Sequence, residues 1–488
     1  MVNTQLPFAS LAALASVNTT VLTDPGLINA TCKAIADAIS PESAIYYLGP
    51  QYDTSVYHWA SSSSEQAMCA FEPTTTHDIA VALQIIGEHT CPFAVKGGGH
   101  AMNPGFSSTI GVHIGMSKFS EVEYNSEAQT VTIGAGMVWD DVYAALEPHG
   151  VNVVGGRISG IGVAGFTLGG GYSWLTNQHG LTIDTVEAYE LVLPSGTVVN
   201  VTQSSYPDLF FALKGGYNNF GIVSRFTLKT FPQGQVWGGM IVYGWHVVEQ
   251  VTAATASFSE NNADPKAQII TTYNYIAGQG PMITQSLFYD GPTPPAGVFD
   301  QYLAIPHFMK DVSTRSFLSL IKAFPMDTML QFRGVFNTIS VTGYPEKLLQ
   351  AVADETIAQG QALAPSSAVY VTYSVSPFLP NIFTHNTSPS AYPGSRDRAV
   401  FPLNLYFGWM SPSADEVMQD ATRTSAEKLY NDAVALGQSI SDAPLYNNYA
   451  IFDTPLESIY GDNLQRLKSI KQQVDPSNVM GLAGGFKF

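Results

Sequence analysis

The chain has 488 residues, of which 45% are hydrophobic and 11% aromatic, enough apolar material for two or three domains with sizeable cores. Only 12% are charged, and 21 Lys and Arg against 39 Asp and Glu leave a net charge of −18. This acidity disfavours nucleic acid and anionic membranes as partners, because both would repel the chain. Low charge with abundant Ser, Thr, Tyr and Asn is typical of a secreted glycoprotein.

The first residues carry a possible export signal. Residues 8–17 (FASLAALASV) are apolar and small, and Ala13-Leu14-Ala15 offers an A-x-A cleavage site, although no Lys or Arg precedes them. Residues 1–15 therefore predict either a signal-like segment of a secreted, extracellular protein or an ordinary N-terminal helix. No apolar run reaches the ~18 residues that a membrane span needs. Four N-x-S/T sequons predict glycosylation at Asn18, Asn29, Asn200 and Asn386.

Three cysteines, Cys32, Cys69 and Cys91, cannot all pair within one chain. One disulfide and one buried thiol is the simplest arrangement in an oxidising compartment. No CxxC occurs, and the ten histidines show no HExxH spacing, so we predict no metal site.

The first half of the chain alternates short apolar runs with glycine clusters. Residues 76–89 have the period of an amphipathic helix, and residues 92–95 predict a buried strand directly before three glycines. Pro194-Ser195-Gly196 between two apolar runs predicts a hairpin over 189–201. Further strands are expected at 111–116, 130–133, 190–193 and 222–228.

The sequence pattern changes after about residue 236. Strands are expected at 240–243 and 368–374, and helices at 348–362 and 414–436. Residues 377–400 predict a long loop that covers a site. The whole pattern indicates an α+β fold with two lobes.

The first glycine cluster is Lys96-Gly97-Gly98-Gly99-His100. Residues without a Cβ let successive backbone N–H groups approach an anion closely. The cluster therefore predicts a phosphate cradle with a histidine at its rim.

The second cluster, residues 155–172, holds a literal G-x-G-x-x-G at Gly160, Gly162 and Gly165, with Asp184 19 residues further on. This spacing is compatible with a nicotinamide dinucleotide fold. That fold requires an uninterrupted helix after the last glycine, whereas residues 169–171 are three more glycines, each costing about 1 kcal/mol in a helix. The strands and helices of a parallel sheet do not follow either, so the nicotinamide alternative is disfavoured.

Several segments together resemble the berberine-bridge-enzyme-like flavoproteins of the vanillyl-alcohol-oxidase superfamily. They are Val95–His100 with Gly105-Phe106-Ser107, residues 155–173 with His179-Gly180-Leu181 and Asp184, Asn219–Val223, Tyr446–Tyr449, Tyr460–Asn463 and Asp475–Val479. The resemblance spans roughly residues 30 to 488. It implies a PCMH-type FAD-binding domain over 30–235 (core 70–232), a substrate domain with an antiparallel sheet over 236–445, and a C-terminal segment, 446–488, that returns to the FAD domain.

The resemblance also implies FAD linked covalently through its 8α-methyl to His100. A second, cysteinyl link falls on Ile158, so only the histidyl link is expected, and this argues against a sugar substrate. Ile161 falls where the family gates oxygen, and its bulk argues for a slow reaction with oxygen. Cys32 and Cys91 match a family disulfide. The expected FAD-binding residues are Lys96, Gly97, Gly98, Gly99, His100, Ala101, Gly105, Phe106, Gly156, Ile161, Gly162, Gly165, Gly169, Gly170, Gly171, Ser173, His179, Asp184, Gly221, Ile222, Val223, Asn448 and Asn463.

A flavin is itself the redox agent, so the protein supplies position, polarity and a proton acceptor. Hydride transfer from a substrate C–H to flavin N5 needs a base for the neighbouring hydroxyl or amine proton. Tyr446 is the first candidate, on condition that its pKa lies below the usual value near 10, and Tyr373 is the second. Asn448 and Asn463 are expected either to hydrogen-bond the flavin or to order the C-terminal segment.

These observations predict a secreted FAD-linked oxidoreductase that removes a hydride from a small organic alcohol or related metabolite. Molecular oxygen or another acceptor would reoxidise the flavin. One alternative is an oligosaccharide oxidase. Another is a flavin-loaded cyclase or binding protein without redox turnover.

Overall fold

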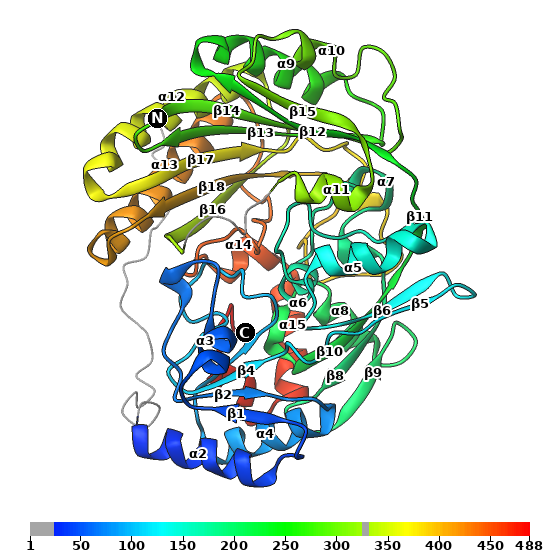
Figure 1. Ribbon diagram of the computed structural model, residues 1–488, viewed down its shortest axis with the longest axis vertical. Helices are drawn as coiled ribbons and strands as arrows, with labels where there is room; N and C mark the ends of the chain where they lie inside the picture. Colours follow the sequence, from blue (N-terminus) through cyan, green and yellow to red (C-terminus); the bar gives the residue numbers. More distant parts are fainter. Residues whose placement is uncertain (1–23, 325–330) are drawn as a thin grey trace.

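A computed structural model describes residues 24–324 and 331–488. The signal-like segment 1–15 and the sequon at Asn18 lie outside these residues. The molecule has two regions, an upper one built on a single large sheet and a lower one that contains the N-terminal strands and the end of the chain (Figure 1). Its mixture of helices with largely antiparallel sheets confirms the predicted α+β class.

The lower region begins with helix α2 (Pro25–Ala38) and a four-stranded sheet in the order β1-β2-β4-β3. Strands β2 (Cys69–Glu72) and β3 (Phe93–Lys96) both pair parallel to β4 (Val112–Gly115), and β1 (Ala44–Tyr46) is antiparallel to β2. Helix α4 spans Thr76–His89, as its apolar period predicts, and the Thr75 hydroxyl caps it by accepting from the Asp78 N–H.

A five-stranded antiparallel sheet completes the lower region, in the order β5-β6-β10-β8-β9. The predicted hairpin is formed by β8 (Val186–Val192) and β9 (Val198–Val201). The other strands are β5 (Val122–Asn125), β6 (Thr130–Gly134) and β10 (Ile222–Lys229). Strand β10 alternates buried and half-buried residues over most of its length, so one of its faces is in the core.

The upper region is a seven-stranded antiparallel sheet in the order β15-β12-β14-β13-β17-β18-β16. Helices α9 (Val248–Asn261), α12 (Glu346–Leu363) and α13 (Asp415–Ala435) cover one of its faces (Figure 1). The opposite face is turned toward the lower region. The strands are β12 (Val236–Gly244), β13 (Ala267–Ile276), β14 (Gly280–Tyr289), β15 (Met309–Arg315), β16 (Arg333–Val341), β17 (Ala368–Val375) and β18 (Phe401–Trp409).

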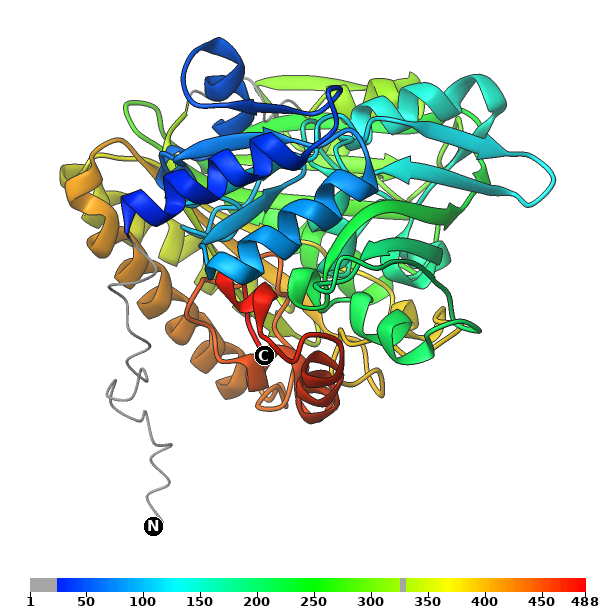
Figure 2. The same ribbon diagram turned by 90° about the horizontal axis from the view of Figure 1, so that it is seen from below.

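The end of the chain returns to the lower region after α13. Helices α14 (Leu456–Tyr460) and α15 (Asn463–Val474) lead to a last segment in which Ala483 forms a parallel bridge with Phe93 of β3. The Asn219 amide donates to the carbonyl of Phe486 at 2.8 Å. Figure 2 shows this segment and the C-terminus beside the N-terminal helices. The remaining elements are short: α3 (Pro50–Val56), α5 (Trp139–Leu146), β7 (Val151–Asn152), α6 (Val163–Leu168), α7 (Thr176–His179), α8 (Pro207–Leu213), β11 (Phe231–Pro232), α10 (Asp300–Ala304) and α11 (Phe317–Lys322).

Residues 377–400 form the expected long connection, with a single 3₁₀ turn at Ile382–Thr384. It is anchored to the lower region by the ion pair of Arg396 with Asp184, at 2.7 Å, whose carboxylate is fully buried. None of the helices in the described part of the chain has the length and apolar character of a membrane span.

The predicted Cys32–Cys91 disulfide is wrong. Cys32 of α2 is bonded instead to Cys69, the first residue of β2, with their Cα atoms 6.2 Å apart, and Cys91 is a free, buried thiol. All three cysteines lie in the same buried core cluster. The order of the sheet decides which of them face each other, and their spacing along the chain does not reveal it.

We therefore expect the Cys91 thiol to be alkylated only after unfolding and without reduction, because it is buried and unbonded. Cys32 and Cys69 should react only after reduction, which peptide mass spectrometry would show. The Cys32→Ser and Cys69→Ser variants should lose about 2–4 kcal/mol of stability, whereas Cys91→Ser keeps the crosslink. Recovery of a peptide that joins Cys32 to Cys91 would contradict this pairing.

Candidate functional site

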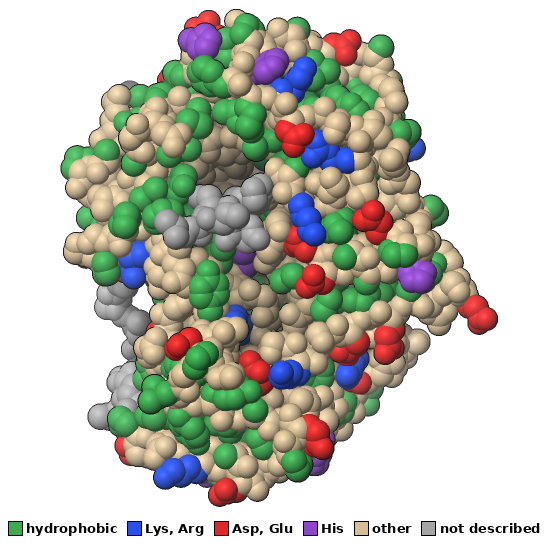
Figure 3. Space-filling model, viewed as in Figure 1, with side chains coloured by type: hydrophobic (Ala, Val, Ile, Leu, Met, Phe, Trp, Pro, Cys, Tyr) green, Lys and Arg blue, Asp and Glu red, His purple; other side chains and the backbone are tan. Residues whose placement is uncertain are grey.

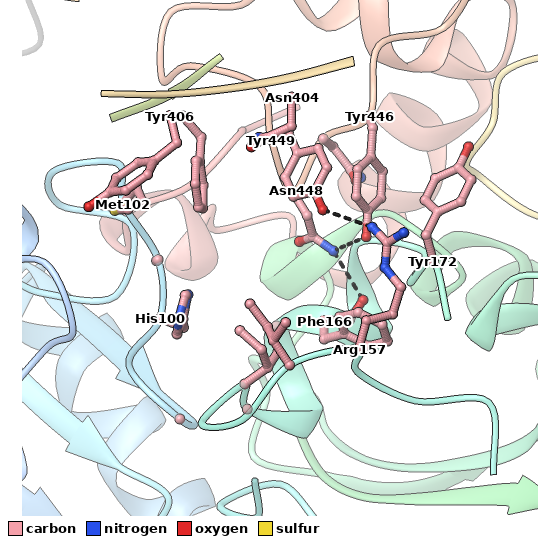
Figure 4. Close-up of a pocket in the computed structure, with 18 of the residues that line it drawn as sticks. His100, Met102, Arg157, Phe166, Tyr172, Asn404, Tyr406, Tyr446, Asn448 and Tyr449 are labelled. Atoms are coloured by element: carbon pink, nitrogen blue, oxygen red, sulfur yellow. Dashed lines mark hydrogen bonds between the residues drawn. The ribbon is translucent and has the colours of Figure 1, made fainter. Parts of the chain in front are cut away.

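A cavity of about 630 Å³ lies between the seven-stranded sheet and the lower region. Figure 3 shows a hollow in the molecule at this level, and Figure 4 shows the side chains that line the cavity. One wall is formed by the sheet, a second by the first glycine cluster and His100, and a third by residues 157–172 and 446–450.

Alternate residues of two neighbouring strands form the sheet wall of the cavity. Thr372 and Ser374 of β17 line the cavity, as do Asn404 and Tyr406 of β18. Residues between them must face the other way, because successive side chains of a strand point to opposite faces. Tyr373 is accordingly buried against helix α13, where its hydroxyl bonds the Ser425 hydroxyl at 2.7 Å. The prediction of Tyr373 as a base at the site is therefore wrong.

His100 stands on the second wall, directly after the strand β3 and the three glycines. Its ring stacks on Trp59 with centroids 4.4 Å apart and planes 14° from parallel. Burial lowers the pKa of His100 to about 4, so the imidazole is neutral at neutral pH and keeps a free lone pair. Its Nε2 is buried and has no hydrogen-bond partner among the described residues.

The two glycine clusters touch each other at Gly98 and Gly162. A Cβ placed on Gly98 would lie 2.5 Å from the Gly162 Cα, so neither position tolerates a side chain. The helix that begins after Gly162, α6, ends after six residues at Gly169. The long helix of a nicotinamide dinucleotide fold is thus absent here, in agreement with the sequence argument.

A hydrogen-bonded network forms the third wall (Figure 4). The Asn448 amide donates to the Tyr446 hydroxyl at 2.8 Å and to the carbonyl of Phe166 at 3.1 Å. The Arg157 guanidinium donates to the Tyr449 hydroxyl at 3.1 Å. Burial raises the pKa of Tyr446, which is contrary to the condition set for a base. Tyr446 is at the site, but as a neutral phenol that donates or accepts a hydrogen bond.

The cavity brings together about half of the residues predicted to bind FAD. Those that line it are Gly97, Gly98, Gly99, His100, Ala101, Phe106, Ile161, Gly162, Gly165, Ile222, Val223 and Asn448. Ile158, at the position of the second link, lines it too, and none of the three cysteines does.

Other predicted residues lie outside this cavity and have structural partners instead. Asp184 binds Arg396, the Asn463 amide donates to the carbonyls of Ser390 and Ala391, and His179 stacks on Phe231 at 3.7 Å. Lys96 donates to the carbonyl of Ser55 at 2.8 Å. The residues Gly105, Gly156, Gly169, Gly170, Gly171, Ser173 and Gly221 also stand outside the lining. Asn463 therefore orders the chain, the second of its two expected roles.

Sequence reasoning missed Arg157, and it assigned no role to Tyr449 or Trp59. One signal was available for Arg157. It is the only charged residue in the run of residues 155–172, within a chain that has few charges. The contacts of Tyr449 and Trp59 depend on segments far away in sequence, and no local pattern indicates them.

The features of the cavity fit a bound flavin cofactor. Besides His100 Nε2, three buried polar atoms of lining residues have no partner in the described chain: Asn103 Oδ1, Asn404 Nδ2 and Asn447 Oδ1. A Cβ on Gly165 would meet nothing within 4 Å, so this turn of α6 faces open space. Buried polar atoms without a hydrogen-bond partner lower the stability of a protein unless a ligand bonds them. No three His, Cys, Asp or Glu side chains of residues 24–324 and 331–488 are grouped as a metal site.

Residues 67–202 match the FAD binding domain family, and residues 445–483 match the family described as berberine and berberine-like. The chain is 30% identical to the FAD-dependent monooxygenase drtC of Aspergillus calidoustus over 98% of its own length and 95% of that protein. The chain belongs to the berberine-bridge-enzyme-like FAD-linked oxidoreductases.

Solved structures confirm the two-lobed FAD-binding fold of this family. Physcomitrella patens BBE-like 1 superposes with a TM-score of 0.74 at 20% identity, covering 92% of this chain and 97% of that one. The glucooligosaccharide oxidase of Acremonium strictum, whose FAD carries a 6-S-cysteinyl and an 8α-N1-histidyl link, gives 0.75 at 18% identity, covering 93% and 97%. The family model and the fungal relative show that the chain is an FAD-dependent oxidoreductase, and the solved structures show that it has the fold its motifs predict.

Two buried histidines support the segment that carries His100. His58 bonds Val56 O at 2.8 Å and Ser107 Oγ at 2.9 Å, and His113 bonds Ser55 O at 2.9 Å. Burial lowers the pKa of His58 to about 4 and that of His113 to about 3. Both rings are thus neutral in the folded protein at neutral pH.

Acidification should destabilise the protein before its carboxylates titrate. Between pH 6.5 and about 4 the unfolded chain binds protons at these two histidines that the folded chain does not, so the free energy of unfolding falls as the pH falls. Urea unfolding at pH 7.5, 6 and 5 would measure this slope. The His113→Gln variant should flatten it by about one proton, and an unchanged slope would contradict the assignment.

Proposed function

We propose that this protein holds FAD by a single covalent link to His100 and oxidises a small organic alcohol. The neutral, buried imidazole with an unpartnered nitrogen is the observation that carries the proposal. It lies on the wall of the cavity beside the glycine clusters of the FAD binding domain family. Ile158 at the lining, with no cysteine there, supports one link in place of two.

When bound, the flavin accepts a hydride and passes its two electrons to molecular oxygen or another acceptor. The residues of the chain position the alcohol and receive its proton. Tyr449 is half-buried and lines the cavity, and its hydroxyl accepts a hydrogen bond from Arg157. Tyr449 would relay the proton: its oxygen takes the proton of the substrate hydroxyl as its own hydroxyl proton leaves toward solvent, and the neighbouring cation stabilises the negative charge that develops on the oxygen between the two transfers. We assign proton acceptance to Tyr449, and orientation of the substrate hydroxyl to Tyr446.

The shape of the site also supports a small substrate over an oligosaccharide. Apolar side chains such as Met102, Phe166, Phe324 and Phe336 line the cavity together with the hydroxyls and amides of the sheet wall, a combination that suits a mainly apolar carbon skeleton with few polar groups. The neighbour that is named a glucooligosaccharide oxidase has a doubly linked FAD, whereas Ile158 supports a single link here. The bulk of Ile161 on the same wall supports a slow reaction with oxygen.

Secretion and glycosylation belong to the same proposal. A disulfide between Cys32 and Cys69 is typical of an oxidising compartment. Asn200 is exposed on β9, and Asn29 and Asn386 are half-buried on α2 and on the 377–400 loop. All three remain predicted acceptors of glycans.

We expect flavin absorbance to stay with acid-precipitated wild-type protein and to be lost from the His100→Ala pellet. The His179→Ala variant is the control, because His179 lies outside the cavity and should keep the colour. A colourless wild-type pellet with FAD in the supernatant would contradict the covalent link while leaving a flavoprotein.

The proposed oxidation is tested by mixing the enzyme anaerobically with a panel of primary alcohols. Stopped-flow absorbance would measure the rate at which each alcohol reduces the flavin. We expect Tyr449→Phe to slow the reduction by about 10²-fold or more, because it removes the proton acceptor. Tyr446→Phe should slow it less than tenfold, since it removes an orienting hydrogen bond. Equal effects would contradict the assignment to Tyr449. A flavin that no alcohol or sugar reduces would favour the alternative without redox turnover.

A further inference from the structure

Arg157 is a buried cation that has no ionised partner among residues 24–324 and 331–488. It follows β7 in the loop that leads to α6, and the whole residue is 7% exposed. Among the described residues that line the cavity, it is the only one with a full charge at neutral pH. Its place in the cavity is visible beside Tyr446 and Tyr449 (Figure 4).

The described contacts of Arg157 are all with neutral groups. Its Nη1 donates to the Ser376 hydroxyl at 3.2 Å and its Nη2 to the Tyr449 hydroxyl at 3.1 Å. The Phe378 ring lies 5.7 Å from the guanidinium carbon. Arg396, which is half-buried and also ties two segments together, has by contrast the carboxylate of Asp184 at 2.7 Å.

Burying a charge without a counter-charge is costly, and hydrogen bonds to neutral hydroxyls offset only part of the cost. A guanidinium has five N–H donors, and only two take part in the described hydrogen bonds of Arg157. A protein retains such a group where a ligand supplies the missing anion. The planar fork of the guanidinium fits a carboxylate with two parallel hydrogen bonds.

We propose that Arg157 binds a carboxylate of the substrate, so that the alcohol oxidised at this site is also an organic acid. This inference rests on the proposed function and names its substrate class. The guanidinium would hold the acid group at the end of the cavity formed by Tyr449 and Ser376. The aromatic and aliphatic lining, with Phe336 and Met102, would pack against the carbon skeleton.

Benzoate and benzamide are matched probes, because they have the same ring and size but differ in charge. We would titrate each into the flavin-loaded enzyme and follow the perturbation of the visible flavin spectrum. Wild type should bind benzoate at least about tenfold more tightly than benzamide. Arg157→Gln should weaken benzoate about 10–100-fold and leave benzamide unchanged.

Three variants serve as controls. Ser376→Ala removes a neutral partner and keeps the cation, so the preference for benzoate should persist. Arg157→Lys keeps the charge without the fork and should give an intermediate preference, which covers the case that Arg157→Gln does not fold. Tyr449→Phe should retain benzoate binding.

Several results would overturn the proposal. One is that benzoate leaves the visible flavin spectrum unchanged. Another is that wild type binds benzoate and benzamide with equal affinity. A third is that Arg157→Gln loses affinity for both probes equally. Benzoate binding that appears only in Tyr449→Phe would show that the cation serves the tyrosine, and would also overturn it.

The reductants mandelate and mandelamide, whose hydroxyl is adjacent to the carboxyl carbon and so can reach Tyr449 while the carboxylate is on Arg157, separate this proposal from the function itself. We expect the acid to bleach the flavin at lower concentration than the amide, with the difference lost in Arg157→Gln. If both bleach it equally and benzoate shows no preference, the carboxylate proposal fails and alcohol oxidation stands. If benzoate binds selectively and no alcohol bleaches the flavin, the proposed function fails and the anion site stands.

Discussion

The contact between Gly98 and Gly162 is the constraint on which the site depends. Two loops more than 60 residues apart meet backbone to backbone, and a Cβ on Gly98 would lie 2.5 Å from the Gly162 Cα. This approach places His100, at the end of one loop, on the same cavity as Ile161 beside the other. A larger residue at either glycine would separate His100 from the wall that carries Arg157. The glycines thus have two roles: they allow the two loops to meet, which shapes the cavity, and they leave the backbone open to a phosphate.

The two faces of the seven-stranded sheet differ because successive side chains of each strand point to opposite sides. Odd-numbered residues of β17, such as Tyr373, pack against α13, while the even-numbered Thr372 and Ser374 face the cavity. The face that the helices cover belongs to the buried core. The cavity face carries small hydroxyls and amides, which can bind a ligand without filling the space that the ligand needs. The same strands therefore supply both the stability of the upper region and the polar wall of the site.

Charge is distributed unevenly between the site and the rest of the protein. The chain has a net charge of −18, yet the described lining of the cavity contains one cation and no carboxylate. His100 is kept neutral by burial, which suits a nucleophilic nitrogen. Electrostatic interactions are stronger inside a protein than in water, so the single guanidinium favours an anionic ligand over a cationic one.

The local sequence by itself determined the elements and the family. Residues 76–89 form the expected helix because their apolar period and the Thr75 cap act within a few residues. The glycine clusters and His100 were found because glycine is required where backbones meet. Only the tertiary structure decided the partner of Cys32, the face on which Tyr373 lies, and the surroundings of Tyr446 and Arg157. Those depend on strand order, on the register of the sheet and on burial, which are set by residues far apart in the chain.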